Sequence, residues 1–255
     1  MRPFNLEIGK KFPKLSHAPI GEAVIQWIAS PTHALNEADL LEKVKSRFPD
    51  YTAESQLEVQ VEAEFQGKAN AEGKPIAGIK HRSKWDGLRL TSTDEKHVCQ
   101  FRPNGVAFSR LKPYEDWEKF TTAATPFWLA FVEWANPPLI DRIGVRFISQ
   151  IDLESGNLAD YMEEPSSSLE SIGLKPAFFF HKDVFSIPGY PYGVTLNRTI
   201  QSTVEAGNRS LIVDIDITTT ETTMLESTES RLQEMRFIKN EIFFAFMKDA
   251  EKHFS

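Results

Sequence analysis

Alternation of apolar and polar residues predicts most of the β-strands in this chain. The clearest case is LEVQVEAEFQ at residues 57–66, where leucine, valine, alanine and phenylalanine occupy every second position. Because successive side chains of a strand point to opposite faces, this pattern predicts a strand with one buried and one solvated face. Similar patterns predict strands at 21–29, 83–93, 96–101, 106–111, 141–153, 177–187, 193–202 and 210–220. The Asn-Gly pair in RPNG, 102–105, favours a hairpin turn between two of them.

Apolar residues at helical spacing predict three main helices. The first covers 37–48, with Asn36 as its N-cap and Pro49 at its end. An aromatic-rich helix spans 112–138, with a kink or break near Pro126. The last spans 227–254 with Ser227 as its cap, and short helical pieces are expected at 157–164 and 167–173.

The order of these elements predicts the fold class. Each half of the chain runs strand, helix, several antiparallel strands and long helix, although no residue-level repeat is visible. We therefore expect a two-layer α+β domain: a curved antiparallel sheet with long helices on one face, of the helix-grip or saddle type. One compact domain, 1–255, would consist of two halves, 1–136 and 137–255.

Composition narrows the classes of partner and the cellular location. The 255 residues carry a formal net charge of −7, which argues against a protein that grips a nucleic-acid backbone. The single cysteine, Cys99, cannot form an intramolecular disulfide, and no segment approaches the roughly 20 apolar residues of a membrane span. We expect a cytoplasmic protein that does not contact membranes.

Three segments carry a family resemblance. LSHAPIGEAVIQW near the start, YEDWEKF before the central helix and RIGVRFISQID after it resemble a sporadically distributed, uncharacterised bacterial protein family. That family has an API-EA strand near its N-terminus and an R-G-R-[YF]-I-N strand in its centre. The matching positions are Ala18, Pro19, Ile20, Glu22, Ala23, Tyr114, Trp117, Arg142, Gly144, Arg146, Phe147 and Ile148.

The resemblance spans residues 15–152 and supports the fold expectation, but it implies no activity. The chain departs from the family pattern at two places. Ser149 stands where the family has asparagine, and Met235-Arg236 stands where a Leu-His pair is expected. Any family role of that asparagine or histidine would therefore not carry over.

Common catalytic and cofactor motifs are missing from the sequence. The six histidines are scattered, Cys99 has no cysteine at ligand spacing, and there is no glycine-rich phosphate loop or G-x-S-x-G turn. We therefore expect no catalytic residue, no metal and no cofactor.

Two arginines on one strand face raise the question of a ligand. In RIGVRFISQID, Arg142 and Arg146 lie opposite the apolar side, as Asp214 and Asp216 do in LIVDIDI. If these strands are neighbours, the arginines and aspartates should form cross-strand ion pairs. Alternatively, Arg142 and Arg146 converge with Arg89 and Arg198 on a concave sheet face and bind a small anion.

The acidic residues support an alternative function, that of a metal-dependent hydrolase. Glu62 and Glu64 share a strand face, as do Asp214 and Asp216, and such carboxylates bind divalent metals in hydrolases of the triphosphate-tunnel type. Gln66, however, stands where the Glu-x-Glu-x-Lys motif of those enzymes needs lysine. A solvated strand face explains the same pattern.

The terminal helix offers a second surface. Leu232, Met235, Ile238, Lys239, Ile242 and Phe246 trace a core stripe, and Phe237, Phe243 and Phe244 widen the apolar arc. The wider arc is explained by core packing or by contact with a protein partner or a second copy. The sequence thus favours a non-catalytic binding protein, whose partner is a small anion on the arginine-bearing sheet face or another protein, such as a neighbouring gene product. The phosphohydrolase is the alternative.

Overall fold

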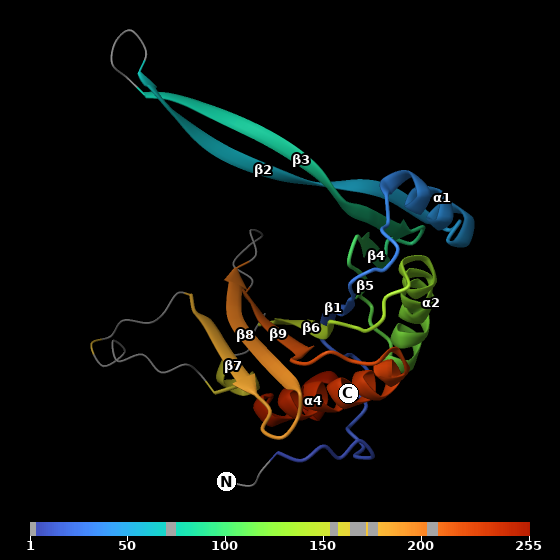
Figure 1. Cartoon of the computed structure of the whole chain (residues 1–255). Coiled ribbons are helices and arrows are strands. Elements are labelled where there is room, and N and C mark those ends of the chain that lie inside the picture. Colours follow the sequence, from blue (N-terminus) through green and yellow to red (C-terminus); the bar gives the residue numbers. More distant parts are fainter. Residues whose placement is uncertain (1–3, 70–74, 154–157, 164–171, 173–177, 203–208) are drawn as a thin grey trace.

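Nine antiparallel strands form one curved, open sheet in the computed structural model of the chain (Figure 1). The strands are β1 (Ile20–Ile28), β2 (Tyr51–Ala69), β3 (Pro75–Ser92), β4 (His97–Arg102), β5 (Gly105–Leu111), β6 (Arg142–Asp152), β7 (Phe180–Ser186), β8 (Tyr192–Ser202) and β9 (Arg209–Thr219). Their order across the sheet is β2-β3-β4-β5-β1-β6-β9-β8-β7.

The two halves of the chain follow the same path through this sheet. In each half the first strand lies beside the last one, β1 beside β5 and β6 beside β9, and the intervening strands extend outward as a meander. The halves join where β1 pairs antiparallel with β6, from Ile20 beside Ser149 to Ile28 beside Arg142. The α+β fold with two similar halves is therefore confirmed.

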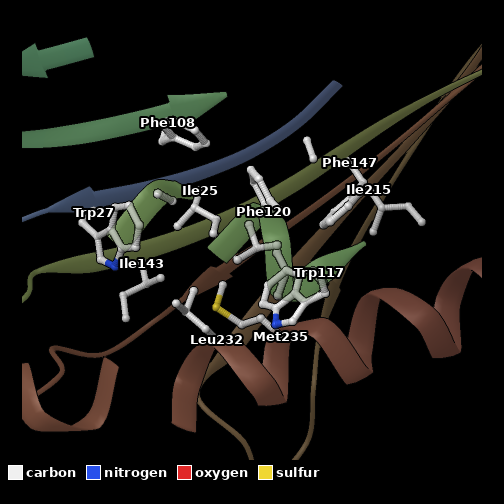
Figure 2. Close-up of a cluster of buried hydrophobic side chains, with 14 of the residues drawn as sticks. Ile25, Trp27, Phe108, Trp117, Phe120, Ile143, Phe147, Ile215, Leu232 and Met235 are labelled. Atoms are coloured by element: carbon white, nitrogen blue, oxygen red, sulfur yellow. The ribbon is translucent and has the colours of Figure 1, made fainter. Parts of the chain in front are cut away.

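Helices cover one face of the sheet. They are α1 (Glu37–Arg47), α2 (Trp117–Ala135), α3 (Leu158–Tyr161), α4 (Thr228–Phe246) and α5 (Ala250–Phe254), with a 3₁₀ turn η2 (Leu225–Ser227) before α4. Helix α2 packs against β5, and α4 packs against β6 and β9. Figure 2 shows Trp117 and Phe120 of α2 and Met235 of α4 meeting Phe147 and Ile215 of the sheet.

The structure describes residues 4–69, 75–153, 158–163, 172, 178–202 and 209–255, with only the backbone for 60–69, 75–82 and 202. Most of the helical piece predicted at 167–173 lies outside these residues. No helix in the described ranges has the length and apolar character needed to cross a membrane.

The hairpin of β2 and β3 differs from its prediction. The alternation at 57–66 predicted a buried face, yet the side chains of Leu57 and Val59 are 59% and 60% exposed. β4 pairs only with Leu88–Thr91 of β3, so the distal hairpin projects beyond the rest of the sheet (Figure 1). Alternation defines two sides of a strand, but burial also needs a covering layer, which is missing here.

The central helix begins later than predicted and is not broken at Pro126. Asp116 caps its start, because the Asp116 carboxylate accepts a hydrogen bond from the Lys119 backbone N–H at 2.7 Å. Pro126 lies inside the helix on an exposed side, where water can solvate the carbonyl that lost its partner.

The terminal helix predicted at 227–254 is two helices. Ser227 occupies the N-cap position of α4 but makes no side-chain capping bond. The chain leaves α4 after Phe246, and Asp249 adopts a φ of 43° before α5 begins. The backbone N–H of Lys248 donates to the Tyr161 carbonyl at 2.8 Å, so a tertiary contact with α3 accompanies this break.

Candidate ligand-binding site

The predicted pairing between Arg146 and an aspartate of β9 is confirmed. The Arg146 Nε and Nη2 atoms each lie 2.8 Å from one carboxylate oxygen of Asp214, which gives a bidentate ion pair. Asn197 of β8 donates to the same carboxylate at 2.9 Å. Arg142 instead donates to the side-chain oxygen of Gln26 on β1 at 2.9 Å.

The other two candidate arginines lie elsewhere. Arg198 stands directly beside Val213, which is buried under the helices, so Arg198 is on the helix-covered face and donates to Asp183. Arg89 is on β3, four strand positions from β6 and therefore roughly 19 Å away. The four arginines do not converge on one concave face, because sheet order and strand parity separate them. Anion binding by any one of them stays a prediction.

A double-mutant cycle measures the ion pair. Replacing Arg146 and Asp214 by alanine, singly and together, should show a coupling of about 1 kcal/mol in urea unfolding. The value is modest because Arg146 is about half exposed. The same cycle with Arg142 and Asp214, which are not bonded to each other, should show almost none. Equal coupling in both cycles would contradict a specific pair.

The four acidic candidates are not brought together either. Glu62 and Glu64 lie on β2, and Asp214 and Asp216 lie on β9, six positions along the sheet, so the two pairs cannot bind one metal ion. Side chains of Glu62 and Glu64 are outside the described part. Among the residues that are described, no group of three or more His, Cys, Asp or Glu could hold a metal. Burial raises the pKa of Asp216, while Arg146 acts in the opposite direction.

The α4 phenylalanines contact other parts of the chain. The Phe237 ring lies 5.8 Å from that of Phe12 in the N-terminal arm, residues 4–19, and the Phe244 ring stacks on Phe12 at 5.7 Å. Phe243 is buried and contacts Phe254 of α5. These three residues therefore contribute to internal packing, and partner binding through them stays a prediction.

A cavity of about 910 Å³ lies between the N-terminal arm, α4 and the helix-covered face of the sheet. Its lining comes from arm residues 8–15 and 18–20, residues 114–119 at the start of α2, Phe147 and Ser149 of β6, Ile215 of β9, and Gln233, Arg236, Phe237, Lys239, Asn240, Phe243 and Phe244 of α4. Its volume is within the range of small-molecule sites.

Lys239 is the most unusual group in this cavity. Its Nζ atom lies 4.4 Å from the centre of the Phe147 ring, and it forms no hydrogen bond or ion pair with any residue described. Burial, helped by the neighbouring Arg236, lowers the pKa of Lys239 to about 7. The residue keeps some accessible surface and lines the cavity, so a ligand there can reach its amine. Near neutral pH the amine is present in both charged and neutral forms.

Other polar groups of the cavity lack partners. The indole Nε1 of Trp117 is buried and has no acceptor among the described residues. Ser149 is only 3% exposed, and its hydroxyl makes no hydrogen bond within that same part of the chain. Burial raises the pKa of Tyr114, so its phenol stays protonated. The Ser149 and Tyr114 hydroxyls are thus two donors in the cavity lining besides Lys239.

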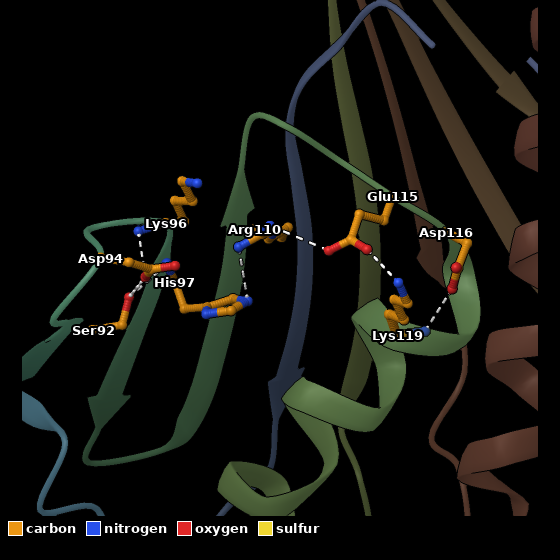
Figure 3. Close-up of polar contacts among 8 residues, drawn as sticks. All are labelled: Ser92, Asp94, Lys96, His97, Arg110, Glu115, Asp116 and Lys119. Carbon is orange, nitrogen blue, oxygen red and sulfur yellow. Dashed lines mark hydrogen bonds and ion pairs between the residues drawn. The ribbon is translucent and has the colours of Figure 1, made fainter. Parts of the chain in front are cut away.

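The start of α2 forms one side of the cavity, and its carboxylates are already bonded to other residues of the chain (Figure 3). Glu115 forms ion pairs with Lys119 and, at 3.7 Å, with Arg110, which contacts His97 Nε2 at 3.1 Å. Burial and Arg110 together lower the pKa of His97. Asp116 is occupied as the helix cap.

Positive charge exceeds negative charge around the cavity. Its lining contains six cationic residues, Lys10, Lys11, Lys14, Lys119, Arg236 and Lys239, and three carboxylates, Glu115, Asp116 and Glu118. Lys10 pairs with Glu241, and Arg236 pairs with Glu118 at 2.8 Å. Lys11, Lys14 and Lys239 form no ion pair with the part of the chain that is described.

Comparisons with known proteins identify no relative. Neither a protein-family model nor a curated protein sequence matches this chain.

The segments quoted for the family resemblance meet at this cavity. Pro19 and Ile20 of the first segment, Trp117 of the second and Phe147 of the third all line it. Ser149 and Arg236 line it as well.

Sequence reasoning placed Lys239 in a core stripe without assigning it a role. A lysine among Met235, Ile238 and Ile242 was a usable signal, because a lone charge on an apolar helix face needs a partner or a shifted pKa. The sequence could not show that Lys239 lines a cavity, because the arm on the other side of that cavity is more than 200 residues away from Lys239 in the chain.

Proposed function

We propose that the protein is a cytoplasmic binding protein that holds a small anionic ligand in the Lys239 cavity. The observation that carries the proposal is an excess of positive charge around a cavity of ligand size, in a chain whose overall charge is −7. Ligand sites combine an apolar lining with a few placed polar groups, as Phe147, Trp117 and Lys239 do here.

The cavity is a better anion site than the arginine-bearing sheet face. Arg146 is already neutralised by Asp214 in a bidentate pair. Lys239 has no carboxylate partner among the residues described, and an anion would supply one. Because a buried ammonium without a counter-charge is costly, a bound anion recovers more free energy there than at a satisfied pair.

Binding should be linked to protonation of Lys239. The titratable and charged groups around it are Arg236 on α4, Lys10, Lys11 and Lys14 on the arm, and Tyr114, Glu115, Asp116, Glu118 and Lys119 at the start of α2. A bound anion stabilises the ammonium and raises the Lys239 pKa above its free value of about 7. Affinity should therefore fall about tenfold per pH unit above pH 7, until the pKa of the complex is reached.

Calorimetric titration with lactate and with inorganic phosphate tests this expectation. Lys239→Met should weaken binding about tenfold or more at pH 6, and Lys239→Arg should bind with little dependence on pH. Lys43, which lies on α1 away from the cavity, provides the matched control as Lys43→Met. No binding of either probe at pH 6, or equal binding by Lys239→Met, would refute the site.

A protein partner is the second proposal, and one observation supports it. Leu57 and Val59 expose apolar side chains on the same side of the projecting β2–β3 hairpin. Exposed apolar groups that share one strand face are typical of contact surfaces. Replacing both by threonine and comparing the species that elute with the protein from its native host tests this surface.

A further inference from the structure

Lys239 has three properties that a lysine does not need in order to attract an anion by charge alone. Its amine has no counter-ion among the described residues, it is surrounded by the Phe147 ring and other apolar groups, and it is accessible from the cavity. A lysine that only attracts an anion works best fully charged at a wet surface. Removal from water favours the neutral amine, which carries the lone pair of a nucleophile.

We infer that Lys239 forms a reversible imine with a small carboxylate that carries an aldehyde or ketone group. This inference rests on the proposed anion site and adds the chemical class of the ligand. The unpaired Lys11 and Lys14 and the nearby Arg236 provide positive charge for the carboxylate end. The carbonyl end is then left for the apolar part of the cavity, where Lys239 and Phe147 lie.

Hydrogen-bond donors for the reacting oxygen are present in the same lining. The Ser149 hydroxyl lacks an acceptor among the described residues, and the phenol of Tyr114 is protonated because burial raises its pKa. Such donors stabilise the negative charge that develops on a carbonyl oxygen under attack. Neither hydroxyl makes a hydrogen bond with a described residue.

The chemical step is balanced without a further reagent. The neutral Lys239 nitrogen attacks the carbonyl carbon, a C–N bond forms, and the carbonyl π bond breaks to give a carbinolamine. One amine proton moves to the oxygen in that step; the C–O bond then breaks, the hydroxyl leaves as water with the second proton of the nitrogen, and a C=N bond remains. No oxidant or reductant is consumed, and addition of water reverses the reaction.

Reductive trapping provides the test. The full chain is incubated at pH 7 with pyruvate and sodium cyanoborohydride, and the adduct is located by peptide mass spectrometry. We expect one adduct per chain, on Lys239, formed about tenfold or more faster than on any other lysine, because ordinary lysines with a pKa near 10.5 are almost fully protonated at this pH. Glyoxylate serves as a smaller probe of the same class.

Matched variants and lactate separate the possible outcomes. Lys239→Arg and Lys239→Met should lose the adduct, whereas Lys43→Arg, on α1 away from the cavity, should keep it. Lactate has the carboxylate but no carbonyl, so it should compete without being trapped. At saturating pyruvate, the labelling rate of the wild type should rise with pH until the pKa of Lys239 in the complex is passed, and level off above it.

Each contrary result has a distinct meaning. Binding of lactate and pyruvate without a Lys239 adduct overturns the imine and leaves the anion site standing. Absence of binding by both overturns the anion site as well. Uniform labelling of surface lysines also refutes the inference, and peptide mapping of the wild type decides this even if a variant fails to fold.

Discussion

Replacing Lys239 by methionine should stabilise the protein by up to roughly 5 kcal/mol at neutral pH. The folded protein lowers the Lys239 pKa from its ordinary value of 10.5 to about 7, and each pH unit of that difference corresponds to about 1.4 kcal/mol. Methionine has a similar length and no charge to desolvate, so it should fill the same position beside Phe147 without this cost.

The stability gained by Lys239→Met should decrease as the pH rises from 7 to 10.5. Between pH 7 and 10.5 the unfolded chain keeps a proton on Lys239 that the folded chain has released, so wild-type stability rises with pH. Below pH 7 both states are protonated, and the full cost persists. The advantage of Lys239→Met in urea unfolding should therefore be largest at pH 6 to 7 and almost vanish at pH 10.5.

Lys119→Met is the control for that experiment. Lys119 is exposed and paired with Glu115, so its loss should change the free energy of unfolding very little at any pH. Equal stability of Lys239→Met and the wild type at pH 6 would show that Lys239 is not desolvated. The imine and the anion site would then lose their common basis.

Phe127→Ala should destabilise the protein by about 3 to 5 kcal/mol. The Phe127 ring is buried and stacks on Phe48 at 4.2 Å, with Tyr51 at 5.2 Å and Phe108 at 5.4 Å. It therefore joins α2 to the end of α1, to β2 and to β5. Truncation leaves a cavity that these elements cannot fill by small side-chain movements.

Leu129 provides a matched control on the same helix. Its side chain is 53% exposed, so Leu129→Ala should cost about 0.5 kcal/mol or less in the same urea titration. A similar loss for both variants would contradict the assignment of this stability to the buried aromatic cluster, because alanine is the better helix former at both positions.

In the sheet, alternation predicted which side chains of the central strands are buried. In β6, alternation correctly placed Ile143, Val145 and Phe147 under the helices, because a strand has only two faces. Matching alternation in β9 also predicted the Arg146–Asp214 pair. The prediction for Arg198 was wrong because it followed residue type: in β8, Arg198 alternates in phase with the buried Val194, Leu196 and Ile200.

The cavity beside Lys239 could not be predicted from sequence patterns. Lys239 stood in an apolar helical stripe in the sequence, but nothing near it indicated an empty volume or a missing carboxylate. The N-terminal arm, the start of α2 and α4 come together only in the folded chain. The break between α4 and α5 is likewise accompanied by a tertiary contact, between Lys248 and Tyr161.

Local periodicity and chain order were enough to predict the element types, the antiparallel two-half fold and the buried side of the central strands. The exposure of Leu57 and Val59, and the open volume beside Lys239 in place of a counter-charge, follow from how distant segments pack. Burial and electrostatic environment are sums over all neighbours, and most neighbours of a cavity are distant in sequence.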